Sequence, residues 1–337
     1  MRATSQARGI TAMPTFQFYK NGAMITEMKG ANSSQLERLV RQYSGPAPEK
    51  PKVVVERSPY SNFPQARFCY FEVMKNLPMI KKKILEENEK IGDTHQLTNG
   101  EIVLFEGILD KLTATSFYHA SKFDTLQYAV LLKLLQWPNN KNLPALDILR
   151  LMVLHPDAAS HYAASYENDK EDNVIAICVS FLMETELPDT IHFMVWRFFC
   201  NLFKEERLHT SLKELFRQLL DIAESSYLDH KNIQVKLAIA TLCFNYSVLS
   251  IREKDSEKKH KITSFLLSFL PHLNDPEILQ RGLLALGTCC YKEPQIQTQV
   301  NPSLDKLNGQ MDTVYAGQQD KILLLKEELS KLIHSNQ

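Results

Sequence analysis

The sequence predicts a mainly α-helical fold, in which a helical solenoid follows a short β-hairpin and one helix. Glycine makes up only 11 of the 337 residues, which leaves little room for tight hairpins, phosphate-binding loops or a dinucleotide-binding fingerprint. About ten or eleven amphipathic segments with a period near 3.6 residues follow one another from Leu77 onward. Near the N-terminus, Asn21-Gly22 is a strong signal for a two-residue hairpin turn, because both residues tolerate positive φ.

The charge and composition of the chain exclude several classes of protein. The 39 lysines and arginines balance the 39 aspartates and glutamates, so we expect no general binding to nucleic acid or to membranes. Hydrophobic residues make up 44% of the chain and charged residues 23%, which excludes disorder for most of it. No run of about 18 apolar residues predicts a membrane span, and the N-terminus lacks the apolar core of a secretory signal. We expect a cytoplasmic protein, with the nucleus as a second compartment.

The N-terminal segment is expected to form two strands and one helix. Residues 14–20 are rich in aromatic and β-branched side chains, and residues 23–28 return as the second strand, with Gly30 at its end. The run Asn32-Ser33-Ser34 supplies N-cap residues for a helix that ends near Tyr43. A hairpin and one helix are too few to bury a core of their own, so we expect a loosely held, incomplete fold.

Residues 1–43 also carry a family resemblance. The runs Arg8-Gly9-Ile10-Thr11-Ala12-Met13-Pro14-Thr15-Phe16 and Phe18-Tyr19-Lys20-Asn21-Gly22, followed by Gly30, resemble the C-terminal half of a thioredoxin domain. The resemblance implies a cis peptide bond before Pro14, opposite the redox cysteines of that family. The strands and helix with the CxxC motif would precede residue 1, and the chain has no CxxC elsewhere. We therefore expect a truncated domain that does not exchange thiols and disulfides.

Residues 44–59 are expected to be a linker between two domains. The stretch Ser44–Lys52 contains three prolines and two lysines, a composition that favours extended and solvated backbone. Beyond the linker, Phe63 and Phe68 are expected to anchor the chain on the domain that follows.

The amphipathic segments after the linker predict a helical array over residues 60–335. Breaks fall where proline predicts them, at Trp137-Pro138, His155-Pro156, Leu187-Pro188 and Asp275-Pro276. The spacing is compatible with helix pairs of roughly 40–47 residues, which stack into an α-solenoid with a curved inner groove suited to extended peptides. After the first helix at Leu77, the expected helical segments are 101–112, 123–135, 143–155, 172–183, 189–203, 207–228, 231–250, 258–272, 276–291 and 319–334.

Motifs inside the array are more specific than its periodicity. They are Phe63-Pro64, Trp137-Pro138, Pro144–Leu151 with His155-Pro156, Arg197–Phe203, Ile233–Val248 and Arg281–Thr288. In this order they resemble the PUL domain family over residues 60–335. The resemblance implies an armadillo-like superhelix of about six repeats, whose groove binds the C-terminal tail of the AAA ATPase valosin-containing protein. It implies a noncatalytic adaptor of the ubiquitin–proteasome system that reaches ubiquitin or ubiquitinated clients indirectly.

Two alternatives from other functional classes remain open. A thioredoxin segment followed by a PUL domain also resembles longer proteins with an upstream PPPDE-type thiol peptidase. The chain would then be a fragment of a peptidase for ubiquitin or ubiquitin-like conjugates, with the PUL domain as its targeting module. A disulfide oxidoreductase is the other alternative, and the missing CxxC argues against it.

Polar residues within otherwise apolar helical motifs are the candidates for binding a peptide. A tail with acidic residues and a free carboxylate needs fixed donors, which arginine supplies as a rigid fork, while asparagine can pair with an extended backbone. The asparagines could equally hold neighbouring helices together, and the arginines could be salt-bridged. The residues that match the PUL motifs are Arg150, Arg197, Asn201, Asn245 and Arg281, with Lys133 and Trp137 as weaker matches.

The sequence gives little support for catalysis, a metal site or a cofactor. The six cysteines lie in apolar helical runs without metal-binding spacing, and the ten histidines are scattered singly. A cluster of cations at residues 252–261 is expected to be a solvated polar loop. We therefore expect no enzymatic activity from this chain, and no metal or cofactor.

Overall fold

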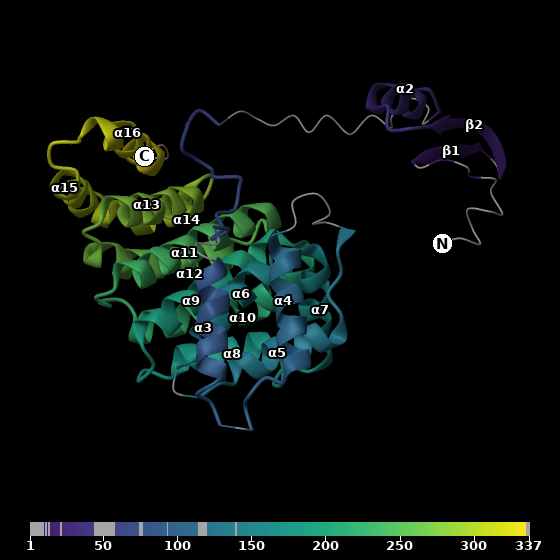
Figure 1. The fold of residues 1–337 in the computed structure, drawn as a ribbon. Helices are drawn as coiled ribbons and strands as arrows, with labels where there is room; N and C mark the ends of the chain where they lie inside the picture. Colours follow the sequence, from purple (N-terminus) through teal and green to yellow (C-terminus); the bar gives the residue numbers. More distant parts are fainter. Residues whose placement is uncertain are drawn as a thin grey trace. The chain divides into compact units, whose positions relative to one another are not determined.

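A computed structural model describes residues 10, 12, 14–20, 22–43, 58–73, 77–92, 94–113, 120–138 and 140–334. The chain divides into two compact units, Met1–Arg57 and Ser58–Gln337 (Figure 1). The boundary lies close to the end of the predicted linker, of which residues 44–57 are outside the described residues.

The N-terminal unit contains the predicted hairpin and helix. Strands β1 (Thr15–Lys20) and β2 (Ala23–Lys29) pair antiparallel, and α2 (Ser33–Tyr43) follows them. Gly22 and Gly30 have φ of +83° and +92°, the left-handed region that favours glycine at these two turns. In the described part of this unit, Met28 and Leu39 are the only buried hydrophobic side chains, so its core is small, as the sequence predicts.

The cis bond predicted before Pro14 stays a prediction, because Met13 lies outside the described residues. A cis peptide bond is present between Phe63 and Pro64, in the other unit.

The second unit consists of helices, which confirms the predicted fold class. Prolines occupy the first turn of several helices, where the missing N–H costs nothing. The helices are α3 (Leu77–Asn88), α4 (Asn99–Thr113), α5 (Thr125–Leu135), α6 (Leu143–Met152), α7 (Pro156–Asn168), α8 (Val174–Met183), α9 (Asp189–Asn201), α10 (His209–Ser226), α11 (Ile233–Glu253), α12 (Ser256–Phe269), α13 (Pro276–Cys290), α14 (Pro294–Val300), α15 (Leu304–Val314) and α16 (Asp320–His334).

Three of these helices were absent from the sequence-based prediction. Helix α7 buries three alanines and two tyrosines, Ala158, Ala159, Ala163, Tyr162 and Tyr166, residue types that give a weaker hydrophobic period than leucine or isoleucine. Helices α14 and α15 are short and rich in polar residues, so their sequence shows little amphipathic period. Small or sparse apolar faces are buried here because neighbouring helices cover them, which a single-helix pattern does not reveal.

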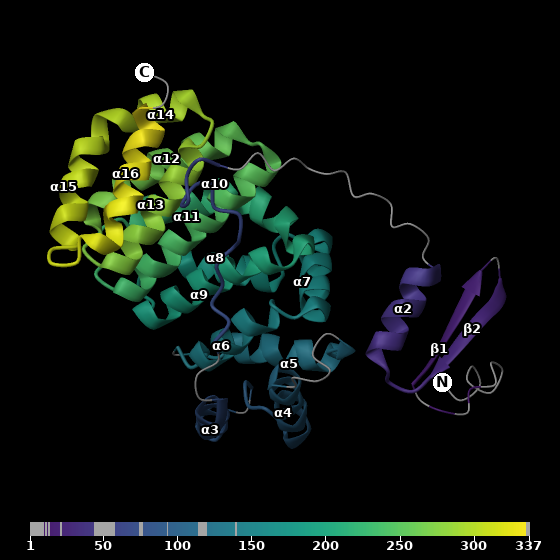
Figure 2. The ribbon, with the colours of Figure 1, turned by 90° about the horizontal axis from the view of Figure 1, so that it is seen from above.

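The helices form a solenoid with a row of successive inner helices. Helices α6, α9, α11 and α13 pack side by side in chain order, with α4 before α6 and α16 after α13 (Figures 1 and 2). The number of repeats stays a prediction, since α3 and α4 both contact α6 at the start of the row. Helices α5, α8, α12 and α14 pack against helices of this row, and α10 packs against α8 and α12.

Helix α11 is the centre of this row. By length and composition it could cross a membrane, but 78% of its most apolar window is buried inside the solenoid. Its neighbours α9 and α13 cover both flanks. A helix that is apolar all round is therefore explained here by burial in a protein core.

Candidate functional site

Residues 58–73 form an irregular stretch, here named the groove segment, that crosses the inner row of helices. Figure 2 shows it as a dark-blue trace that passes α13, α11 and α9 and reaches α6. Its contacts follow the reverse order of the solenoid: Ser61 and Asn62 bind α16, Cys69 binds α11, and Phe71 binds α9 and α6. The chain therefore lays its own extended peptide along the face that the sequence predicts to bind peptides.

Asn245 and Asn201 hold the backbone of the groove segment by paired hydrogen bonds. Asn245 Oδ1 accepts from the N–H of Cys69 at 2.8 Å, and its Nδ2 donates to the carbonyl of Cys69 at 2.8 Å. In the same way, Asn201 Oδ1 accepts from the N–H of Phe71 at 2.7 Å, and its Nδ2 donates to the carbonyl of Phe71 at 3.1 Å. The two bound residues lie two positions apart, the side-chain period of an extended strand. Both asparagines are fully buried, so their amides need hydrogen-bond partners, and the half-buried backbone of Cys69 and Phe71 supplies them.

The same amides also hold the scaffold. Nδ2 of Asn201 donates to the carbonyl of Arg150 at 2.6 Å, and Nδ2 of Asn245 donates to the carbonyl of Cys200 at 3.2 Å. The two roles considered for these asparagines, peptide binding and support of neighbouring helices, are therefore combined in one side chain.

Arg150 completes the contact at the α6 end of the row. Its Nη1 donates to the carbonyl of Phe71 at 2.6 Å and its Nη2 to the carbonyl of Val73 at 3.0 Å. Its Nε donates to Asp147 at 2.6 Å, and the side chain is 3% exposed. The guanidinium of Arg150 thus already has hydrogen-bond partners within this chain.

Arg197 lies beside it, with its guanidinium 4.7 Å from the ring centroids of both Phe71 and Phe193. Its Nη2 donates to Gln234 at 2.6 Å, while its Nε is buried without a hydrogen-bond partner. Burial, with a smaller effect from Arg150, lowers the pKa of Arg197.

Phe63 and Phe68 anchor the groove segment, as the sequence predicts. Phe63 is 1% exposed and lies on Gly287 of α13, where a Cβ atom would be 2.0 Å from its ring. Phe68 packs on Phe203, with ring centroids 5.3 Å apart, and the guanidinium of Arg252 lies 4.1 Å from its ring. Glycine at position 287 thus permits a close approach between helix and ring.

The remaining predicted residues lie elsewhere. Arg281 donates to Thr241 Oγ1 at 3.3 Å and lies near Glu277, so its described contacts are with α11 and its own helix. Lys133 pairs with Glu101 of α4 at 3.0 Å. Trp137 is 3% exposed and donates from Nε1 to the carbonyl of His95 at 3.0 Å, which is a packing role.

Three residues that hold the groove segment were missed by the sequence reasoning. Arg252 donates to the carbonyl of Ala66 at 2.7 Å, and Thr288 Oγ1 accepts from the N–H of Gln65 at 3.1 Å. Glu328 of α16 accepts from the N–H groups of Ser61 and Asn62, at 2.6 and 2.8 Å. The sequence does contain one signal for Glu328: this charged residue lies between Leu325 and Leu329 on the apolar face of α16.

The hydrogen bonds to Glu328 determine its charge state. Burial alone would raise the pKa of this carboxyl, but the N–H donors of Ser61 and Asn62 outweigh burial and lower the pKa. A carboxylate is therefore maintained at neutral pH at the start of the groove segment.

A cationic pocket remains open beside the groove segment. It has a volume of about 320 Å³, and its charged lining consists of Arg67, Lys204 and Arg252 against one carboxylate, Glu206. Phe68, Tyr70 and Phe203 give it aromatic walls, and His209 also lines it. Burial raises the pKa of Tyr70 to about 12, so this phenol stays protonated and can donate a hydrogen bond. The pocket suits a ligand with a carboxylate and an apolar side chain.

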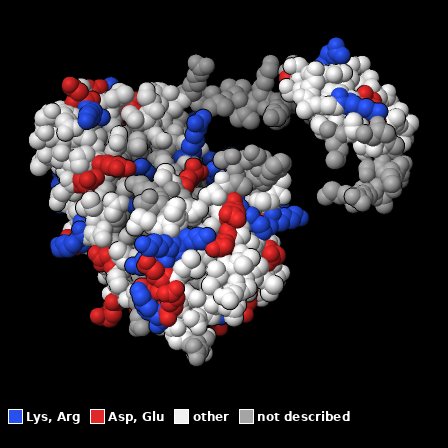
Figure 3. Space-filling model, in the orientation of Figure 1, with Lys and Arg blue, Asp and Glu red and all other residues white. Residues whose placement is uncertain are grey.

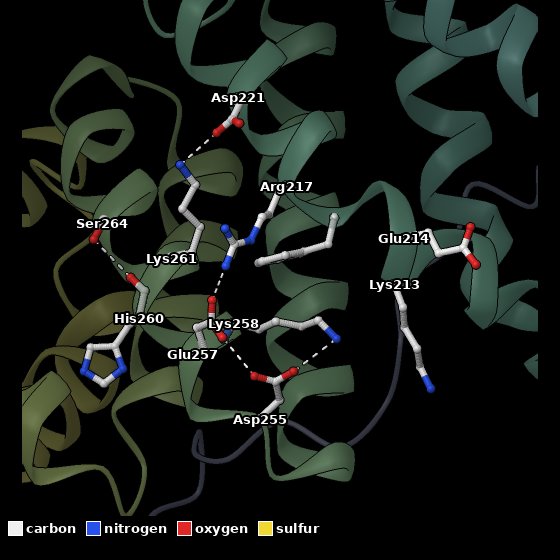
Figure 4. A pocket seen from close by; sticks show the side chains of 11 residues that line it. Lys213, Glu214, Arg217, Asp221, Asp255, Glu257, Lys258, His260, Lys261 and Ser264 are labelled. Carbon is white, nitrogen blue, oxygen red and sulfur yellow. Dashed lines mark hydrogen bonds and ion pairs between the residues drawn. The ribbon is translucent and has the colours of Figure 1, made fainter.

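A second pocket, between α10 and α12, has no surplus of charge (Figure 4). Its four cations face four carboxylates, and most of them pair with each other: Lys213, Arg217, Lys258 and Lys261 against Glu214, Asp221, Asp255 and Glu257. Much of the predicted polar loop at 252–261 is in fact the end of α11 and the start of α12, because Asp255 caps α12. The face seen in Figure 3 likewise mixes both signs of charge.

The buried cysteines are poor nucleophiles. Burial raises the pKa of Cys178, Cys200, Cys243 and Cys290, and raises that of Cys289 to about 12. These thiols are therefore protonated at neutral pH.

Comparisons with known proteins place this geometry in a family. The family model for the PUL domain matches residues 63–321. Phospholipase A-2-activating protein of Xenopus laevis is 27% identical over 233 residues, or 68% of this chain, and the chain spans 28% of that protein. The PFU-PUL domain pair of Saccharomyces cerevisiae Doa1/Ufd3 superposes with a TM-score of 0.55 at 16% identity, over 96% of this chain and 97% of that one, which shows a shared fold.

The thioredoxin-like part has relatives of its own. Thioredoxin 1 of Plasmodium falciparum (isolate 3D7) is 42% identical over 40 residues, which is 12% of this chain and 38% of that protein. Thioredoxin of Coprinus comatus is 53% identical over 38 residues, 11% of this chain and 36% of that protein. These matches support a partial thioredoxin-like segment. Because the PUL model covers well over half of the residues, the chain belongs to the PUL domain family.

Proposed function

We propose that this chain is a noncatalytic adaptor of the ubiquitin pathway, and that its solenoid binds the acidic C-terminal tail of the AAA ATPase valosin-containing protein. Membership of the PUL family supports the adaptor role. The observation that supports peptide recognition most directly is the cationic pocket beside the groove segment, where Arg67, Lys204 and Arg252 lie near aromatic side chains. The peptidase alternative finds no support among the relatives described above.

The tail docks beside the groove segment and leaves that segment in place. Asn201, Asn245 and Arg150 already use their amide and guanidinium groups on residues 69–73. The cationic pocket has three cations against one carboxylate in its lining, and of these Arg252 also donates to the carbonyl of Ala66 and Lys204 also pairs with Glu72. In this arrangement the three buried residues act by holding one wall of the pocket, which Phe68 and Tyr70 form.

The binding energy in such a pocket is largely electrostatic. Arg67 and Lys204 are exposed, and the ammonium of Lys204 pairs with Glu72 at 3.1 Å. Exposed charges interact through water and are screened by salt, so we expect an affinity of about micromolar that weakens as salt increases.

Calorimetry of the full chain with a peptide of the ATPase tail, at two salt concentrations, tests the proposal. The double variant Arg67→Ala, Lys204→Ala should bind about tenfold more weakly and keep its helical circular dichroism. The double variant Lys82→Ala, Lys331→Ala is the matched control, because it removes two exposed cations from α3 and α16. Its affinity should stay within about twofold of the parent chain.

Two results would contradict the proposal. An absence of binding by the folded parent chain would remove the ATPase tail as its ligand. Equal losses in the pocket variant and the control would show that only overall charge matters, and that the pocket is not the site.

A further inference from the structure

Three side chains that are distant in the sequence meet at the start of α9. Asp189 is the first residue of this helix, His192 lies one turn later, and His230 lies in the loop between α10 and α11. One ring nitrogen of each histidine and one carboxylate oxygen of Asp189 lie within 4.8 Å of one another. Two imidazoles and a carboxylate form a common set of zinc ligands.

The spacing of these atoms is close to that of a metal site. His230 Nε2 lies 3.4 Å from Asp189 Oδ1. Two ligands of a tetrahedral zinc ion with bonds of about 2.0 Å lie roughly 3.3 Å apart. This pair therefore has the required separation, and His192 supplies a third ligand atom within 4.8 Å of both.

His192 is the residue that points to a ligand. It is 4% exposed, and its Nε2 lies 3.1 Å from the carbonyl oxygen of Glu184. Because a carbonyl only accepts, the proton is on Nε2 and the lone pair is on Nδ1. That Nδ1 atom is buried and has no hydrogen-bond partner, which is uncommon for a buried polar atom. Metal-binding histidines usually donate their other N–H to such an acceptor.

The surroundings cover the cluster on one side and leave it accessible to an ion on another. The ring of Tyr227 lies 5.5 Å from His192 and 5.4 Å from His230, and covers one side of the cluster. Asp189 is about half exposed, which leaves a path from solvent.

His230 has to change its tautomer when it binds a metal. Its Nδ1 now accepts from the N–H of Asn232 at 3.2 Å, so its proton is on Nε2, facing Asp189. Metal binding moves this proton to Nδ1, releases the contact with Asn232, and places the Nε2 lone pair on the ion. The contact that is released, at 3.2 Å, is at the upper end of the hydrogen-bond range.

We propose that Asp189, His192 and His230 bind a divalent transition-metal ion, with zinc as the favoured ion and water in the fourth position. The two nitrogen donors favour zinc over magnesium or calcium, which prefer oxygen ligands. The ion joins the first turn of α9 to the loop that leads into α11. This site is separate from the groove segment, so the proposed metal binding does not depend on the proposed function.

Thermal unfolding of the full chain, after treatment with a chelator and dialysis, tests the site. Zinc chloride should raise the melting temperature, and magnesium chloride should leave it unchanged. Calorimetric titration should give one zinc ion per chain. Cobalt chloride should produce the visible absorption of tetrahedral cobalt at one equivalent.

Variants identify the ligands. Asp189→Asn and His230→Gln should each weaken zinc binding about tenfold or more, and His192→Gln should abolish the cobalt spectrum. His260→Gln, on α12, is the control and should bind zinc like the parent chain. If His192→Gln fails to fold, Asp189→Asn decides the question, because its side chain is about half exposed. Failure of zinc to shift the parent chain, or an unchanged shift in Asp189→Asn and His230→Gln, would overturn the proposal.

Discussion

The groove segment and the pocket between α10 and α12 are both lined by charged and polar residues, but they use them differently. In the groove, side chains that are 0–3% exposed, Asn201, Asn245 and Arg150, bind main-chain groups. In the pocket, side chains such as Arg217 and Glu257, which are 75% and 77% exposed, pair with each other. The comparison teaches that burial and a backbone partner, more than the number of charges, indicate a place where a peptide is held.

The largest effect should come from the aromatic anchor. Phe63→Ala should lower the free energy of unfolding by about 3–5 kcal/mol, because it leaves a cavity over Gly287. Urea denaturation followed by circular dichroism measures this change. Gly287→Ala is the companion variant, since its Cβ would overlap the Phe63 ring and should expel the segment. A loss below about 1 kcal/mol for both would show that the segment is not part of the folded core.

The next effect concerns the asparagines. Asn245→Ala removes both hydrogen bonds to Cys69 and leaves its half-buried N–H and carbonyl without this partner, at a cost of about 1–3 kcal/mol. Hydrogen exchange measured by mass spectrometry should show faster exchange in the peptide that contains residues 66–73. Unchanged protection of this peptide in the variant would mean that the asparagine does not hold it.

Glu328 should have an effect of similar size, which depends on pH. Glu328→Gln should cost about 1.5–3 kcal/mol at pH 7, because a charged acceptor of two backbone N–H groups becomes neutral. Since the pKa of Glu328 is lowered on folding, its stabilising contribution is complete above the ordinary value of 4.5 and is lost as pH falls through the lowered value. Melting curves of both proteins should therefore converge in acid. A gap that is constant from pH 7 to pH 3 would exclude this linkage.

The smallest effect should be found in the pocket between α10 and α12. Arg217→Ala removes an exposed ion pair with Glu257 and should change the free energy of unfolding by no more than about 0.5 kcal/mol. A loss of stability as large as that of Asn245→Ala would contradict the comparison, because an exposed ion pair would then stabilise the fold as much as a buried side chain bound to the backbone.

Local sequence patterns predicted much of the fold, but not the contacts between distant segments. Asn21-Gly22, the prolines at helix starts and the apolar period of α11 determine structure within a few residues of themselves, so they could be interpreted in isolation. The polar residues Asn201 and Asn245 also stood out, because a buried amide within an apolar helix needs a partner. Their ligand could not be deduced, since residues 69 and 71 lie 176 and 130 positions away.

The same limit applies to the cluster at Asp189. The sequence shows an aspartate and a histidine three residues apart, followed by a single histidine in a different loop. Only the packing of α9 against the connection between α10 and α11 brings the third side chain within reach. Spacing rules for metal sites depend on ligands that are close in sequence, and here one ligand is not.

Asn201 and Asn245 bind backbone atoms, which every extended peptide carries, so the groove segment and a free peptide would compete for the same two amides. Residues 58–73 are joined covalently to α3, so they reach the inner helices at an effective concentration on the order of millimolar or more. A free extended peptide that used the same two amides would have to exceed this local concentration as well as the fit of the resident segment. A ligand of the cationic pocket meets no such competition, because that pocket lies beside the segment.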